Sequence, residues 1–167
     1  KNASVLGWDC GPANSLIDFA VQLRTKGDLN LDEDGRIAAN GLANLNVIEQ
    51  WLQEPFFQKS PPKSTGREEF GVEDLKRRML QLGDVSLEDL LSTLTTFTAS
   101  IISKDLLNLA STQQIRPIEL LVAGGGCKNS FLMNSIAQKI RGLIVRDINE
   151  IGIKSQLREA LAFATLV

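Results

Sequence analysis

The chain has 167 residues, of which 43% are hydrophobic, and its 18 Lys and Arg against 20 Asp and Glu give a formal net charge of −2. This length is sufficient for one domain with a sizeable core. The scattered basic residues disfavour nucleic acid as a partner, and no run reaches the roughly 18 to 20 apolar residues of a membrane span.

The composition also limits the chemistry that the chain can perform. Histidine is absent, so acid and base catalysis fall to carboxylates, and we expect no resident metal site. Cys10 and Cys127 stand beside glycine turns, which favours free thiols in a reducing cytoplasm. The chain begins without Met and ends on an apolar run, so we expect a piece of a longer protein.

The N-terminal part of the chain predicts a strand followed by a helix. A strand over residues 4–9 would place Asp9 at a strand's carboxyl end. A Gly-Pro pair then opens a helix over about residues 13–24, because proline is tolerated in a first helical turn. Asn14 and Asp18 share one face of that helix, since they are four residues apart.

A helix and a proline-led loop follow. Apolar residues recur at helical spacing over residues 37–52, and a Pro-Phe-Phe sequence ends that helix. The loop after it carries Lys63, Ser64, Thr65 and Arg67, a donor-rich set that suits an anion or a sugar. A basic surface loop leading into a helix near residue 72 is the alternative.

The C-terminal half predicts helices that alternate with strands. A capping box at residues 86–89 starts a long helix to about residue 110. Residues 118–123 predict a buried strand, 129–141 a helix, and 143–147 a second strand with Val145 turned inward, before a final helix from residue 156. This order indicates an α/β fold with helix in excess.

Three glycines join the first of those strands to the next helix. Gly124, Gly125 and Gly126 would bring bare backbone N–H groups toward a phosphate or a ribose. The segment has neither the Walker nor the dinucleotide fingerprint. Close backbone packing therefore stays open as the alternative.

Four segments in fixed order resemble the C-terminal half of the anhydro-N-acetylmuramic acid kinase family. They are residues 7–14 (GWDCGPAN), 61–68 (PPKSTGRE), 124–129 (GGGCKN) and 159–164 (EALAFA). The resemblance implies an ATP-dependent sugar kinase of the actin-like, ribonuclease H-like superfamily. Residues 1–167 would then form its C-terminal lobe, a small sheet packed by helices.

The same resemblance implies a reaction. Such kinases phosphorylate 1,6-anhydro-N-acetylmuramic acid at O6 while water opens the anhydro ring, which gives N-acetylmuramic acid 6-phosphate for peptidoglycan recycling. Mg²⁺ accompanies the ATP. Because the first phosphate loop belongs to the N-terminal lobe, residues 1–167 alone are expected to be inactive.

The resemblance further implies roles for single residues. Asp9 matches the general base that deprotonates the attacking water, a helix-capping role being the alternative. Asn14 and Glu159 are expected at the sugar, although Glu159 could instead stabilise a helix N-terminus. The three glycines and Asn129 match the adenosine-side motif. The Lys63 to Arg67 motif is placed at the rim of the cleft without individual roles.

Some positions depart from the family pattern, and some readings stay open. Cys10 stands where Thr is usual, Ala13 where Gly is common, and Thr165 where a Trp often follows. A homodimer is implied only by the family. The alternatives are a non-catalytic nucleotide-binding regulator on the same fold and a kinase for a different amino sugar.

Overall fold

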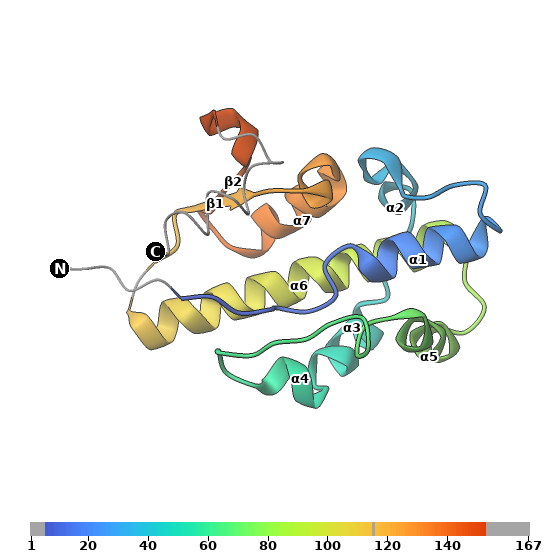
Figure 1. The fold of residues 1–167 in the computed structure, drawn as a ribbon, viewed down its shortest axis with the longest axis horizontal. Helices are drawn as coiled ribbons and strands as arrows, with labels where there is room; N and C mark the ends of the chain where they lie inside the picture. The colour runs from blue at the N-terminus through green and yellow to red at the C-terminus, as the bar shows by residue number, and fades with distance from the viewer. Residues whose placement is uncertain (1–5, 115, 153–167) are drawn as a thin grey trace.

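The computed structural model describes residues 6–114 and 116–152 (Figure 1). The final helix expected from residue 156, and Glu159 with it, lie outside the described residues. The α-helices are α1 (Ser15–Arg24), α2 (Arg36–Ala39), α3 (Leu45–Leu52), α4 (Pro55–Gln58), α5 (Val72–Leu82), α6 (Leu87–Gln113) and α7 (Ser130–Lys139). The strands are β1 (Glu119–Val122) and β2 (Ile144–Asp147), and the 3-10 helices are η1 (Glu33–Gly35), η2 (Gly125–Lys128) and η3 (Ile148–Ile151).

The long helix α6 runs through the middle of the molecule. Figure 1 shows α7 and the strands on one side of it and α3, α4 and α5 on the other. The helix begins as predicted, because the Ser86 hydroxyl accepts the N–H of Asp89 at 3.0 Å. Buried side chains occur around much of its circumference, as expected for a helix enclosed by other elements.

Two hydrophobic clusters meet on α6. The larger cluster contains Trp51, Phe57 and Phe97, whose rings make edge-on contacts at centroid distances of 5.1 and 5.3 Å. The smaller cluster joins Ala99 of α6 to Leu132 and to other apolar residues of α7 and the sheet. Both clusters therefore pack against helix α6.

The two strands pair in parallel with α7 as their connection. Leu120 lies opposite Val145 in the register, and both pack against the smaller cluster, which confirms that Val145 faces inward. Leu121 is exposed, so the expectation of a fully buried first strand is wrong: alternate side chains of β1 point away from the cluster. The predicted helix-rich α/β fold with a small sheet is confirmed.

The single helix expected over residues 37–52 is also wrong. The chain forms α2 and α3, separated by a turn at Gly41. A Cβ atom at Gly41 would stand 2.0 Å from the Glu88 carbonyl oxygen, so the backbone of this turn packs directly on the start of α6. Asn44 then accepts the N–H of Val47 and begins α3 as a new helix.

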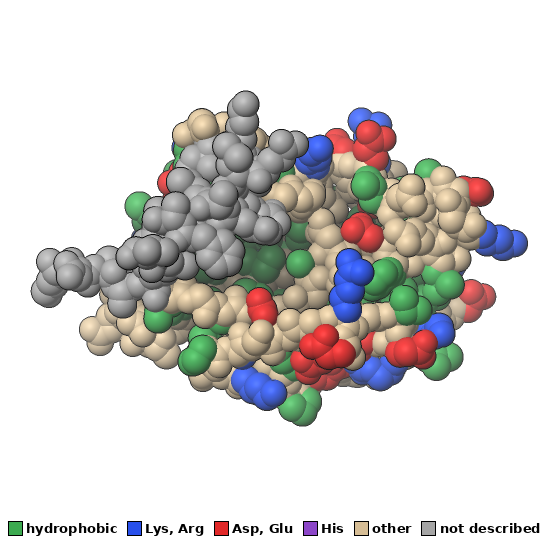
Figure 2. All heavy atoms as spheres, viewed as in Figure 1, with side chains coloured by type: hydrophobic (Ala, Val, Ile, Leu, Met, Phe, Trp, Pro, Cys, Tyr) green, Lys and Arg blue, Asp and Glu red, His purple; other side chains and the backbone are tan. Residues whose placement is uncertain are grey.

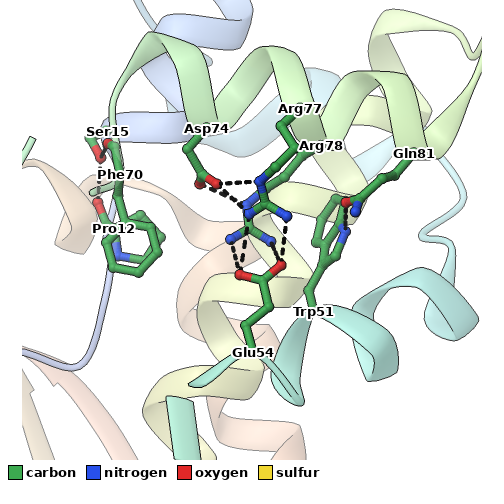
Figure 3. Close-up of polar contacts among 9 residues, drawn as sticks. All are labelled: Pro12, Ser15, Trp51, Glu54, Phe70, Asp74, Arg77, Arg78 and Gln81. Atoms are coloured by element: carbon green, nitrogen blue, oxygen red, sulfur yellow. Dashed lines mark hydrogen bonds and ion pairs between the residues drawn. The ribbon is translucent and has the colours of Figure 1, made fainter. Parts of the chain in front are cut away.

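A buried charged cluster fastens α5 to the chain before α4 (Figure 3). The Arg78 side chain is fully buried between the rings of Trp51 and Phe97, at 4.8 and 4.7 Å. Its guanidinium donates to Glu54 and to Asp74, each at 2.8 Å. These charge-assisted bonds compensate for removing the guanidinium from water.

Candidate functional site

The carboxylate of Asp9 lies exposed shortly before α1. The expected strand over residues 4–9 is wrong for its described part, since residues 6–10 form no strand. Instead, the N–H of Asp9 donates to the carbonyl of Lys63 at 2.9 Å. The proline-led loop, and not a sheet, therefore holds this segment in place.

Two donors of the same loop orient the Asp9 side chain. Ser64 Oγ donates to Oδ2 at 2.8 Å, and the Thr65 N–H donates to the same oxygen at 3.0 Å. The Ser64 bond first, and the Thr65 bond second, lower the pKa of Asp9 because they stabilise the ionised form. Within residues 6–114 and 116–152, Oδ1 accepts no hydrogen bond, so one carboxylate oxygen is available to a water or a ligand.

Asp9 lines two hollows. One, of about 210 Å³, is bounded by Gly11, Pro12, Ser15, Thr65, Gly66, Arg67 and Phe70. The other, of about 410 Å³, is bounded by Gly7, Trp8, Pro62, Lys63 and Ser64. The smaller hollow combines a carboxylate with backbone, hydroxyl and guanidinium donors, which are the groups that bind a sugar.

The Lys63 to Arg67 motif separates into buried and exposed parts. The Lys63 ammonium is buried and pairs with Asp105 at 3.0 Å, so it is not an exposed donor, although Lys63 lines the larger hollow. The Thr65 hydroxyl donates to Glu69 at 2.7 Å. Arg67 is exposed beside the smaller hollow, and within the described part of the chain it forms no salt bridge.

The turn between Asp9 and α1 contains an unusual backbone angle. Ala13 has φ +49°, in the left-handed region that glycine adopts more readily. Thr98 of α6 donates to the Ala13 carbonyl at 3.0 Å and holds the turn. An alanine at this position therefore has a structural cost that glycine would avoid.

The expected glycine turn after β1 is present, with one difference. Gly124 has φ +85°, and the 3-10 helix η2 stands between it and α7, so the glycines do not enter α7 directly. Asn129 is the N-cap of α7, and its Oδ1 accepts the N–H of Leu132 at 2.9 Å. The turn leaves Gly125 exposed, with its backbone open to a ligand.

Asn14 brings the glycine turn next to the start of α1. Its amide lies beside Gly125 and Gly126, where an added Cβ would stand 3.6 and 3.7 Å from Nδ2. A hollow of about 620 Å³ includes Asn14, Gly125 and Asn129. The structure thus places Asn14 with the nucleotide candidates, whereas Asp9 lines separate hollows only a few residues earlier in the chain.

The same hollow is also lined by acidic residues. Asp28, Asp32 and Asp34 line the same hollow, and Asp32 accepts the N–H groups of Ile37 and Ala38 at 2.8 and 2.9 Å. In the part of the chain that the structure describes, no group of three His, Cys, Asp or Glu side chains is arranged to hold a metal ion.

Three residues that shape the site were not predicted. Asp105 pairs with Lys63, Trp8 donates to Asp105, and Gly35 packs so closely on Asn129 that an added Cβ would stand 2.2 Å from its Oδ1. The signal for Asp105 was available, because it continues the spacing of Phe97 and Ile101 along the buried stripe of α6. A carboxylate on such a stripe requires a buried partner.

The fold and the site together define a helix-rich α/β protein with a loop-oriented carboxylate and, at a separate hollow, an exposed glycine turn. A family model described as anhydro-N-acetylmuramic acid kinase matches residues 1–167. The chain belongs to the anhydro-N-acetylmuramic acid kinase family.

Curated relatives agree with this assignment. The chain is 59% identical over 166 residues to the anhydro-N-acetylmuramic acid kinase of Prochlorococcus marinus strain NATL1A. The aligned residues are 99% of this chain and 44% of that protein. The chain is 57% identical to the one of strain MIT 9211 and 52% identical to the one of Parasynechococcus marenigrum strain WH8102, with the same coverage. The chain therefore spans less than half the length of these relatives.

The described residues also bear on a membrane location and on surface charge. No helix among them is both long and apolar enough to cross a bilayer. On the face drawn in Figure 2, acidic and basic side chains are interspersed. No large patch of one charge is visible on the described part of that face.

Proposed function

We propose that the full-length protein containing this chain phosphorylates 1,6-anhydro-N-acetylmuramic acid at O6 with ATP and opens the anhydro ring with water. The proposal places residues 1–167 in the C-terminal lobe of an actin-like kinase, with sugar and nucleotide between two lobes. The observation that carries it is the Asp9 carboxylate, ionised and oriented by Ser64 and Thr65 at the wall of two hollows.

Asp9 acts as the general base in this proposal. The water that attacks the anomeric carbon donates its proton to Oδ1, while Oδ2 remains bonded to the loop. Asp9, with its lowered pKa, is ionised at neutral pH and can accept the proton. The fixed orientation of its carboxylate reduces the entropic cost of reaching the reactive geometry. As the bond between the water oxygen and C1 forms, the C1–O6 bond breaks, and O6 attacks the γ-phosphorus of ATP and displaces ADP.

The glycine turn receives the nucleotide in this proposal. Gly125 presents backbone without a side chain, so an adenosine can lie against the turn, next to Asn14 and Asn129. Mg²⁺ bound with ATP would neutralise phosphate charge during transfer. Asn14 and Glu159 remain proposed sugar contacts, Asn14 from a position that also borders the hollow proposed for the nucleotide. Arg67 offers an exposed donor beside the smaller hollow.

The proposal includes the setting in which the enzyme works. Both Cys10 and Cys127 are free thiols, which agrees with a cytoplasmic location. ATP and the anhydro sugar are the proposed small-molecule partners, and the N-terminal lobe and a second copy of the protein are the proposed protein partners.

Asp9→Asn in the full-length protein tests the proposal. Turnover should fall on the order of 10²-fold or more, while ATP affinity is retained, because the amide preserves shape but accepts no proton. Asp84→Asn is the matched control, since Asp84 is exposed and outside both Asp9 hollows. Near-normal turnover of Asp9→Asn would remove Asp9 from the mechanism.

A second measurement tests the placement of the active site between two lobes. Residues 1–167 alone, supplied with ATP, Mg²⁺ and the anhydro sugar, should show no turnover. Activity of this piece would contradict the proposed cleft. ATP binding by the full-length protein without sugar phosphorylation would instead indicate a nucleotide-binding regulator.

A further inference from the structure

An ion pair that is almost completely shielded from water connects the loop that holds Asp9 to α6. Lys63 Nζ and Asp105 Oδ2 are 3.0 Å apart, and their side chains are 2% and 4% exposed. Burying such a pair has a desolvation cost that its attraction often fails to recover. Fold stability alone is therefore a weak reason for this pair to be present.

The Asp105 carboxylate joins the two segments that hold Asp9. Its Oδ2 accepts the indole N–H of Trp8 at 2.9 Å, and its Oδ1 accepts Lys63 Nζ at 3.2 Å. Trp8 directly precedes Asp9. Lys63 directly precedes Ser64, and its carbonyl accepts the N–H of Asp9. The Asp105 carboxylate thus holds Trp8, the neighbour of Asp9, and Lys63, the neighbour of Ser64.

Besides these two partners, the Asp105 carboxylate has the Cys10 thiol as a hydrogen-bond partner and Lys104 as a charged neighbour. Burial, and then the negative charge of Asp105, raise the pKa of Cys10 to about 11, so the thiol facing Asp105 is neutral. The Lys63 ammonium also lies 5.0 Å from the centre of the Phe56 ring. Lys104 instead donates to the carbonyls of Leu52 and Phe57.

We propose that Asp105 is a positioning residue for Asp9, acting through Trp8 and Lys63. This inference rests on the proposed function, because it assigns Asp105 a part in orienting the proposed base. Asp105 touches neither hollow, so its influence reaches the chemistry only through the Asp9 segment and the proline-led loop. A small displacement of a catalytic group is sufficient to lower turnover strongly.

Asp105→Asn in the full-length protein tests the inference, measured in parallel in the parent and in an Asp9→Asn background. In the parent background, kcat should fall about tenfold or more with the KM for ATP unchanged. In the Asp9→Asn background the same change should lower kcat by less than about twofold, because the effects of residues that act as a unit are non-additive. Unchanged kcat, or an equal loss in both backgrounds, would overturn the inference.

Glu54→Gln is the matched control for a purely structural effect. It weakens the other buried charged cluster, with Arg77 and Arg78, and should lower the unfolding temperature without lowering kcat. A kcat loss in Glu54→Gln as large as that in Asp105→Asn would show a general stability effect and overturn the inference.

If Asp105→Asn fails to fold, the double variant Lys63→Met with Asp105→Leu tests the inference instead. It is expected to fold because it leaves no unpaired charge buried. It should fold and turn over about tenfold more slowly or worse, and normal turnover would overturn the inference. Near-normal activity of Asp9→Asn refutes the proposed function itself. A slow Asp9→Asn with a normal Asp105→Asn refutes only the positioning role.

Discussion

Ser64 Oγ donates a 2.8 Å hydrogen bond to Asp9 Oδ2 across 55 positions of sequence. This bond is the largest cause of the lowered pKa of Asp9. A loop residue therefore lowers the pKa of the proposed base.

Ser64→Ala should raise the pKa of Asp9 toward its ordinary value, because the ionised carboxylate loses its strongest donor. The lowered pKa stabilises the native protein above the unfolded-state pKa, and that contribution is lost as pH falls through the folded-state value. The variant should thus be less stable at pH 7, with the difference vanishing in acid. Titration of the Asp9 carboxyl ¹³C shift measures this, and Ser60→Ala serves as control. An unchanged pKa would contradict the assigned bond.

Gly125→Val should weaken ATP binding while leaving the thermal unfolding midpoint nearly unchanged. The added Cβ meets only Asn14 Nδ2, at an ordinary 3.6 Å, so it causes no clash in the free protein, and the valine occupies space that the proposal gives to the nucleotide. Calorimetric titration with ATP measures the effect. Gly124→Ala is the contrasting variant: φ +85° makes it less stable by roughly 1 kcal/mol. Unaltered ATP affinity in Gly125→Val would remove the glycine turn from the nucleotide site.

Asn129→Ala should lower the free energy of unfolding by about 1 kcal/mol, because α7 loses its N-cap. Asn129→Ser keeps a capping oxygen and should restore most of that stability. Both variants should bind ATP more weakly, since each lacks the amide proposed to lie at the nucleotide. Urea unfolding and ATP titration of the pair separate the two roles. Full ATP affinity in Asn129→Ser would limit Asn129 to capping.

Ala13→Gly should raise the free energy of unfolding by roughly 0.5–1 kcal/mol. The gain arises because glycine relieves the left-handed backbone at φ +49°, and it is partly offset by the greater entropy of the unfolded chain. Ala110→Gly, within α6, should have the opposite sign and lower stability by about 1 kcal/mol. Urea unfolding of both variants tests the pair, and a loss of stability in Ala13→Gly would disprove the strain.

Local signals made parts of the fold predictable from sequence. The Ser86 cap and the glycine turn near Gly124 are encoded within a few residues, and both are found where they were expected. The break at Gly41 was missed because its cause is a contact with the backbone of α6, far along the chain. Helical periodicity continues through such a turn and gives no warning of it.

The candidate site shows the same division. Asp9 was recognisable from its motif, but its bonds to Ser64 and Thr65 depend on two loops meeting in space. The burial of Lys63 was not predictable from a loop that reads as basic and exposed. It required a partner 42 residues away, Asp105, on another element.

Both hydrophobic clusters pack against α6. The helix therefore supports both the Asp9 segment and the side of the molecule that carries the glycine turn. Asp105, in the C-terminal half of α6, accepts hydrogen bonds from Trp8 and Lys63. Thr98, about two turns earlier, donates to the carbonyl of Ala13, and Ala99 packs against the cluster formed with α7 and the sheet. Any rotation of α6 would carry all three together. The Asp9 segment, the Ala13 turn and the glycine-turn side should therefore keep their relative positions when α6 moves.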